Sequence, residues 1–163
     1  MSVVQEFVQA NEQYASTFHK GDLALPPARK VAILVCMDAR IDPARVLGLE
    51  EGDAHVIRNA GGRAADALRS LVISEELLGT KSIVVIHHTE CGMLTFSNAD
   101  IHARIQQDLH TNADNIDFLP FDNLEQSVRD DVAFLRASPL IPQSIDISGF
   151  IYDVHDGKIR PVT

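Results

Sequence analysis

The sequence predicts an α/β fold with a single domain, in which a mainly parallel central β-sheet is flanked by helices. Two short apolar runs, 31–35 and 83–86, are continuous and do not alternate with polar residues, which is typical of buried parallel strands. Segments with helical spacing lie between such runs, the pattern of α/β proteins. With 163 residues, of which 45% are hydrophobic, the chain is long enough for one core. We expect an N-terminal helix and arm over 1–27 and an α/β core over 28–163.

The N-terminal half is expected to alternate helices with strands. Residues 3–18 space their apolar side chains as one face of a helix does. Pro26 and Pro27 then force an extended connection into the first strand. Pro43 is a favoured first helical residue, and Gly48 ends the short helix that it begins. The next predicted elements are a strand over 54–57, a helix over 64–78 and a strand over 82–86.

The C-terminal half contains a weaker helical pattern at 97–110 and a loop at 112–120. Asp122 is expected to cap the next helix, because Glu125 follows it at the spacing of a capping box. That helix closes at Pro139, and 145–154 alternates as a strand does. Asp156-Gly157 then predicts a hairpin turn before a last strand over 158–162.

Composition excludes several classes of function. A net charge of −9 and a pI near 5.1 argue against a nucleic-acid partner. No apolar run approaches the roughly 20 residues of a membrane span, and no signal peptide is visible at the N-terminus. Two cysteines are too few for a disulfide framework, so we expect a reducing, cytoplasmic setting.

The two cysteines of the chain, Cys36 and Cys91, both follow a predicted strand, and His88 precedes Cys91 by three positions. Parallel strands end at the same edge of a sheet, where open α/β folds bind ligands. Two thiolates and one imidazole form a three-ligand zinc set that leaves the fourth position open, as in catalytic sites. On these residues alone, two unrelated buried thiols are the more ordinary interpretation.

Asp38 and Arg40 favour the metal site. They alternate with Cys36, so in extended backbone the three side chains share one face. Arginine can hold a carboxylate with two hydrogen bonds, which would place a fixed acid beside the metal. The alternative is a surface ion pair of little energetic value.

The motif Cys36-x-Asp38-x-Arg40, followed by His88-x-x-Cys91, resembles the motif pair of the β-class carbonic anhydrases. The likeness extends to Arg58-Asn59-Ala60-Gly61 and covers roughly residues 28–155. The resemblance implies a β-carbonic-anhydrase-like fold, one Zn²⁺ per chain on Cys36, His88 and Cys91, and an Asp38–Arg40 catalytic dyad. It also implies hydration of carbon dioxide to bicarbonate, by hydroxide formed at the zinc, in a homodimer or dimer of dimers.

Some positions depart from the family pattern and bear on the substrate. Pro27 stands near the place of a glutamine that often lines the substrate pocket, and Met93 replaces the second glycine of a Gly-Gly pair. Gly61, Gly92 and Met93 are the expected pocket residues. The chain is similar to the compact branch of the family, which also resembles hydrolases of carbonyl sulfide and carbon disulfide. Carbonyl sulfide or carbon disulfide hydrolysis, releasing hydrogen sulfide, is therefore the alternative activity.

Two alternatives of other classes are open at this point. A thiol redox protein would use Cys36 and Cys91, although these lack the C-x-x-C spacing. A non-catalytic, zinc-stabilised interaction domain would normally close its site with a fourth protein ligand. His87 is expected to be a satisfied histidine at a strand end, or else a residue that orients His88 or relays protons.

Overall fold

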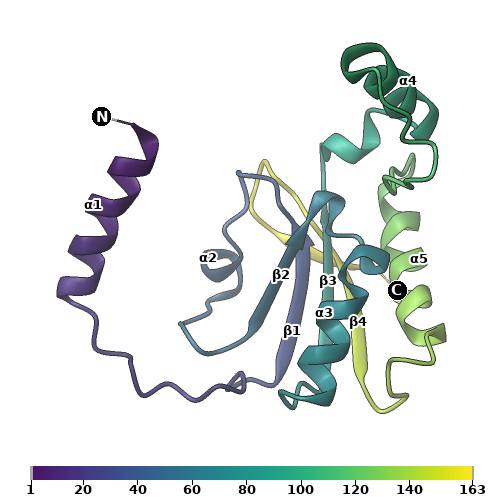
Figure 1. Cartoon of the computed structure of the whole chain (residues 1–163). Helices are drawn as coiled ribbons and strands as arrows, with labels where there is room; N and C mark the ends of the chain where they lie inside the picture. Colours follow the sequence, from purple (N-terminus) through teal and green to yellow (C-terminus); the bar gives the residue numbers. More distant parts are fainter. Residues whose placement is uncertain (1, 163) are drawn as a thin grey trace.

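A computed structural model of the chain describes residues 2–162, which contain one five-stranded sheet in the order β2-β1-β3-β4-β5 (Figure 1). The strands are β1 Val31–Cys36, β2 His55–Asn59, β3 Ser82–His88, β4 Asp146–Tyr152 and β5 Ile159–Val162. The first four pair in parallel, and β5 pairs with β4 antiparallel after the predicted hairpin turn. The expected α/β fold with a mainly parallel sheet is confirmed.

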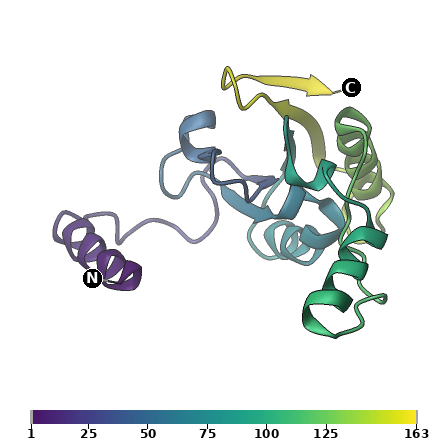
Figure 2. The same ribbon diagram turned by 90° about the horizontal axis from the view of Figure 1, so that it is seen from above.

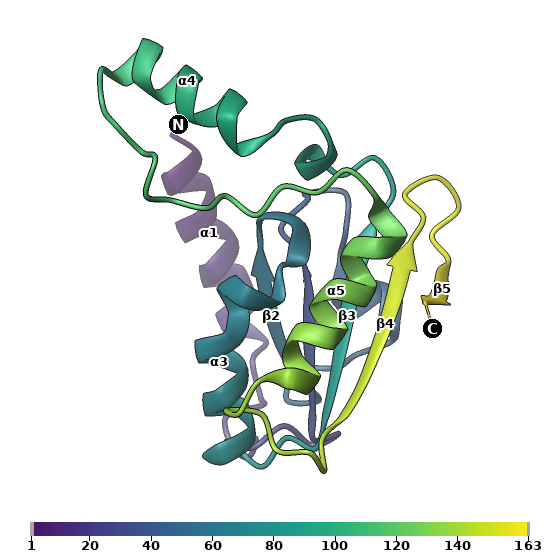
Figure 3. The same cartoon turned by 90° about the vertical axis from the view of Figure 1, so that its right-hand side faces the viewer.

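Helices α3 and α5 cover one face of this sheet (Figure 3). The helices are α1 Val3–Ser16, α2 Pro43–Leu47, α3 Ala64–Glu76, α4 Asn98–Leu109 and α5 Leu124–Ala137, and single 3₁₀ turns occur at η1 Ala60–Gly62 and η2 Gly92–Leu94. The expected cap of α5 is wrong by one residue: Asn123, and not Asp122, accepts the backbone N–H of Gln126. None of the helices within residues 2–162 is long and apolar enough to cross a bilayer.

The core lies on both faces of β1. Ala32 and Leu34 are fully buried in the cluster that includes the inner faces of α3 and α5. Ile33 and Val35 point the other way into a second cluster, which reaches Cys36 and Cys91. Each fully buried aliphatic side chain contributes about 1.5–3 kcal/mol relative to an exposed one. The carboxyl ends of β1 and β3 are therefore held firmly, which matters because both metal-type motifs begin there.

Helix α1 stands apart from the sheet at the end of a long connection (Figure 2). None of its residues is buried, and its apolar side chains Val4, Phe7 and Val8 are all more than half exposed. The Tyr14 hydroxyl donates to the Glu51 carboxylate over 2.6 Å, and Lys20 pairs with the same carboxylate. An exposed apolar face of this kind marks an interaction surface.

A buried carboxyl group makes the stability of the fold pH-dependent. Glu75 of α3 is 6% exposed, and neither of its carboxyl oxygens has a hydrogen-bond partner within the described residues. Burial, and secondarily the charge of Glu76, raise the pKa of Glu75 from 4.5 to about 7. Between these two pH values the folded state therefore binds more protons at Glu75 than the unfolded state does. The stabilisation of the folded state by protonated Glu75 is complete below pH 4.5 and is lost as pH rises through 7.

Glu75→Gln is accordingly expected to raise the free energy of unfolding by about 1–3 kcal/mol at pH 8 and to change it little at pH 4.5. Urea unfolding at both pH values measures this difference. Glu12→Gln, the same change at an exposed position of α1, is the control and should stay within about 0.5 kcal/mol. An equal gain from Glu75→Gln at both pH values would contradict the raised pKa.

Candidate metal centre

Three potential ligand atoms meet at the carboxyl ends of two adjacent strands. Cys36 ends β1, His88 ends the neighbouring β3, and Cys91 follows three residues later. Their ligand atoms lie within 4.8 Å of one another, and all three residues are buried. The two sulfurs are 4.0 Å apart, about twice the length of a disulfide bond, and both thiols are free. The structure thus brings together the three predicted ligands.

The orientation of His88 fits a metal ligand. Its Nδ1 lies 2.8 Å from the Thr89 carbonyl oxygen, so Nδ1 carries the hydrogen and Nε2 keeps a lone pair. That Nε2 is buried and has no hydrogen-bond partner in the described part of the chain, although it faces two sulfurs. A buried polar atom needs a partner, and one imidazole nitrogen with two thiolates is a donor set that zinc prefers.

The two thiols have pKa values that are shifted in opposite directions. The pKa of Cys36 is lowered, mainly by its contact with Cys91 and to a smaller extent by its contact with His88. Burial alone would raise this pKa. The neighbouring Cys36 sulfur and burial in turn raise the pKa of Cys91. A bound dication supplies the opposite charge that allows both sulfurs to be thiolates.

Asp38 and Arg40 form a two-pronged ion pair beside these ligands. Arg40 Nε and Nη2 donate to Asp38 Oδ1 and Oδ2 over 3.0 and 2.8 Å. Asp38 Oδ2 is 3.8 Å from His88 Nε2, and Arg40 holds the pKa of Asp38 well below its usual range. The extended backbone that was expected to bring these side chains together is wrong, because β1 ends at Cys36. Beyond it the backbone turns, and the Arg40 N–H also donates to Asp38 Oδ1 over 2.9 Å.

Comparison with known proteins now decides the family. The family model described as Carbonic anhydrase matches residues 31–159. The chain belongs to the carbonic anhydrase family. Beta-carbonic anhydrase 1 of Mycobacterium tuberculosis is 41% identical, over 100% of this chain and 99% of that protein. The crystal structure of carbonic anhydrase from Streptococcus mutans has a TM-score of 0.95 and 51% identity, covering 100% of this chain and 99% of the other.

The same family includes relatives named for a different activity. Carbon disulfide hydrolase of Saccharolobus solfataricus is 34% identical over 96% of this chain and 87% of that protein. The expected membership of the β-class carbonic anhydrase superfamily is confirmed by these matches. Zinc is the metal of β-carbonic anhydrases, and Cys36, His88 and Cys91 are the group here that suits it.

Sequence reasoning gave no site role to two residues that shape the site of this carbonic anhydrase family member. Arg58 of β2 donates to the Cys36 carbonyl through Nε and Nη2, over 3.0 and 2.9 Å, and to the Asp38 carbonyl over 2.8 Å. These bonds fix the chain where it leaves β1. Glu90 accepts from Arg40 Nη1 over 3.3 Å and so holds the guanidinium from its other side. The family likeness at Arg58-Asn59-Ala60-Gly61 was the available signal for Arg58.

The expected pocket residues lie at different depths. The Gly61 N–H donates to Cys36 Sγ over 3.3 Å, and a Cβ at Gly61 would lie 2.9 Å from Met93 Cγ. Met93 is buried behind this glycine, whereas Gly92 is exposed and borders open space. Pro27 precedes β1 and so lies at the edge of the sheet opposite Cys36. The six residues of β1 span about 20 Å, so Pro27 does not reach the ligands of its own chain.

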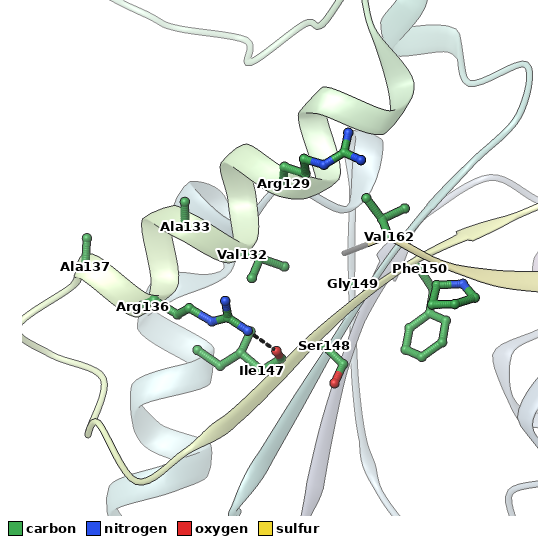
Figure 4. Close-up of a pocket in the computed structure, with 11 residues that line it drawn as sticks. Arg129, Val132, Ala133, Arg136, Ala137, Ile147, Ser148, Gly149, Phe150 and Val162 are labelled. Carbon is green, nitrogen blue, oxygen red and sulfur yellow. Dashed lines mark hydrogen bonds between the residues drawn. The ribbon is translucent and has the colours of Figure 1, made fainter.

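A large groove of the molecule lies away from the metal centre. It has a volume of about 780 Å³ and lies between α5 and β4, where Val132, Gly149 and Val162 line it with two arginines (Figure 4). Arg136 spans part of this groove by donating to the Ile147 carbonyl over 3.0 Å. None of the three ligand residues lines it, so the site must be recognised by its chemistry and not by the size of its cavity.

Proposed function

We propose that the chain catalyses the zinc-dependent hydration of carbon dioxide to bicarbonate. The observation that carries this proposal is the buried pair of sulfurs with the unpartnered His88 Nε2, set 3.8 Å from the carboxylate that Arg40 holds. Full-length similarity to carbonic anhydrases supports it. Within residues 2–162 the ligand group has three members, and a three-ligand set suits a catalytic and not a structural zinc site.

One group of residues would hold the metal, and a second group would orient the reacting hydroxyl group. Cys36, His88 and Cys91 would hold Zn²⁺, which when bound acts as a Lewis acid and makes hydroxide available from water near neutral pH. Asp38 stays ionised because Arg40 lowers its pKa, so its carboxylate accepts a hydrogen bond from the attacking hydroxyl group. That bond directs an oxygen lone pair at the carbon of carbon dioxide. Addition of hydroxide to carbon dioxide gives bicarbonate without any redox change.

Hydrolysis of carbon disulfide or carbonyl sulfide is the second candidate activity. It is favoured by the 34% identity to a carbon disulfide hydrolase and by the apolar Met93 next to Gly61. Sulfur accepts hydrogen bonds weakly, so an apolar wall disfavours it less than oxygen. In either case the substrate is a small linear molecule, bordered by Gly61, Gly92 and Met93.

Turnover of carbon dioxide, carbonyl sulfide and carbon disulfide by the same zinc-loaded preparation separates these activities. Carbon dioxide hydration by stopped flow is expected to exceed hydrogen sulfide release by at least about 100-fold in kcat/KM, a difference of roughly 3 kcal/mol in transition-state stabilisation. Chelator-treated protein supplies the background rate for each substrate. Rapid hydrogen sulfide release with background hydration would replace the first activity with the second.

We further propose a homodimer, or a dimer of dimers, in which the arm over 1–27 packs on a second copy of the 28–163 core. The uncovered apolar face of α1 supports this arrangement. Buried free thiols suit a reducing, cytoplasmic compartment. Sedimentation velocity of the full chain should show at least two copies per particle, and a monomer at micromolar concentration would contradict the assembly.

A further inference from the structure

A buried carboxylate lies behind the metal centre without being one of its ligands. Asp131 of α5 is 3% exposed. Its Oδ1 accepts from Arg63 Nη2 over 3.0 Å, and its Oδ2 accepts from the Ala64 backbone N–H over 3.0 Å and from His87 Nε2 over 3.1 Å. Because a buried charge is costly without such partners, these donors fix the carboxylate at the junction of α5, α3 and β3.

His87 carries this contact towards the sheet. Its Nε2 faces two acceptors, Asp131 and the Gly62 carbonyl at 3.2 Å, so Nε2 bears the hydrogen. Its Nδ1 lies 2.7 Å from the Ser127 hydroxyl, and the Phe121 ring stacks on the imidazole with centroids 5.4 Å apart. The fully buried imidazole therefore has one orientation, which links α5 to the turn η1.

The turn η1 is held against the ends of β1 and β3. A Cβ at Gly62, whose φ is +66°, would lie 3.0 Å from the Cys36 nitrogen and 3.1 Å from the Ile86 carbonyl oxygen. The Asn59 side chain closes the turn by bonding the N–H and the carbonyl of Arg63 over 2.7 and 3.0 Å. At its centre, the N–H of Gly61 donates to Cys36 Sγ.

We propose that Asp131 is a positioning residue of the metal centre, which holds η1 so that the Gly61 N–H stays on the Cys36 sulfur. Asp131 holds Gly62 in place through the His87 imidazole, which contacts both residues, and it holds Arg63 by a direct ion pair. This inference rests on the proposed function, in which Cys36 is a zinc ligand. A hydrogen bond to a ligand atom orients it and adjusts its donor strength, and loss of such an outer partner typically costs about 10–100-fold in metal affinity.

The test compares Asp131→Asn with Asp130→Asn, the same change at the adjacent exposed position. Asparagine keeps the shape of Asp131 but not its charge, and its amide nitrogen would face one of the former donors. The zinc dissociation constant of Asp131→Asn, measured by competition with a chromophoric chelator, is expected to rise about tenfold. The thiolate-to-metal absorption band of the cobalt-substituted protein should shift as well, while Asp130→Asn matches the wild type in both.

A merely structural role would lower the melting temperature of Asp131→Asn and leave its zinc affinity and cobalt band unchanged, which would overturn the inference. Should Asp131→Asn fail to fold, Arg63→Met removes one donor while keeping the apolar stem. It is expected to weaken zinc binding about threefold, and wild-type affinity in that variant would also overturn the inference. Failure of the proposed function appears separately, as a wild-type chain that binds no zinc.

Discussion

Asp38→Asn is expected to lower the turnover of carbon dioxide hydration by about 10²–10⁴-fold, the usual contribution of a positioned acid or base. The carboxylate can accept a hydrogen bond from the attacking hydroxyl group on either oxygen. The amide offers one acceptor and one donor, and it loses the two-pronged pair with Arg40, whose nitrogens lie 3.0 and 2.8 Å from the carboxylate oxygens. Stopped-flow hydration together with metal analysis measures the effect, because zinc should remain at one per chain.

Asp114→Asn is the matched control for this variant, since it makes the same change at an exposed carboxylate outside the site. Its turnover should equal that of the wild type. If Asp38→Asn turned over at the wild-type rate with zinc bound, Asp38 would have no part in the reaction. The non-catalytic zinc domain would then be the better interpretation.

Cys91→Ser is expected to lose zinc and, with it, all hydration above background. A serine hydroxyl is not deprotonated near neutral pH, so only Cys36 and His88 would remain as ligands at this buried position. Metal analysis after dialysis should find less than about 0.1 zinc per chain, since structural and catalytic zinc sites need at least three protein ligands. Met37→Leu, which replaces an exposed sulfur next to Cys36, is the control and should keep its zinc.

This variant also tests the thiol redox alternative. The two sulfurs are 4.0 Å apart in the structure, close enough to bind one metal and too far apart to be bonded to each other. A redox protein would lose its activity in Cys91→Ser without any change in metal content. Retention of one zinc per chain by Cys91→Ser would therefore contradict the assigned ligand set.

The sheet and the ligand group could be predicted because the signals are local. The continuous apolar runs that became β1 and β3 end at or beside Cys36 and His88, and parallel strands bring such ends to one edge. Short-range chemistry also predicted α2, with Pro43 at its start and Gly48 in the left-handed conformation at its end. This topology placed the three residues at one edge, and the resemblance to the β-class carbonic anhydrases was needed to predict them as a ligand set.

The supporting groups could not be predicted because their contacts cross the fold. Asp131 meets His87 across 44 positions, and Arg58 bonds the Asp38 carbonyl across 20, so no spacing connects them. The backbone turn after Cys36 was missed because Cys36, Asp38 and Arg40 occupy every second position. That spacing is compatible with an extended strand as well as with this turn. The cap of α5 is Asn123 and not Asp122, because a sequence pattern places a helix boundary only to within a residue or two.

Zinc titration of metal-free protein, followed by the carbon dioxide hydration rate, tests the central claim most directly. The rate should rise linearly from background and reach its plateau at one zinc per chain, because Cys36, His88 and Cys91 form a single three-ligand group. Full hydration activity in the metal-free protein would contradict the account. A rate that stays at background after one equivalent of zinc has bound would contradict it equally.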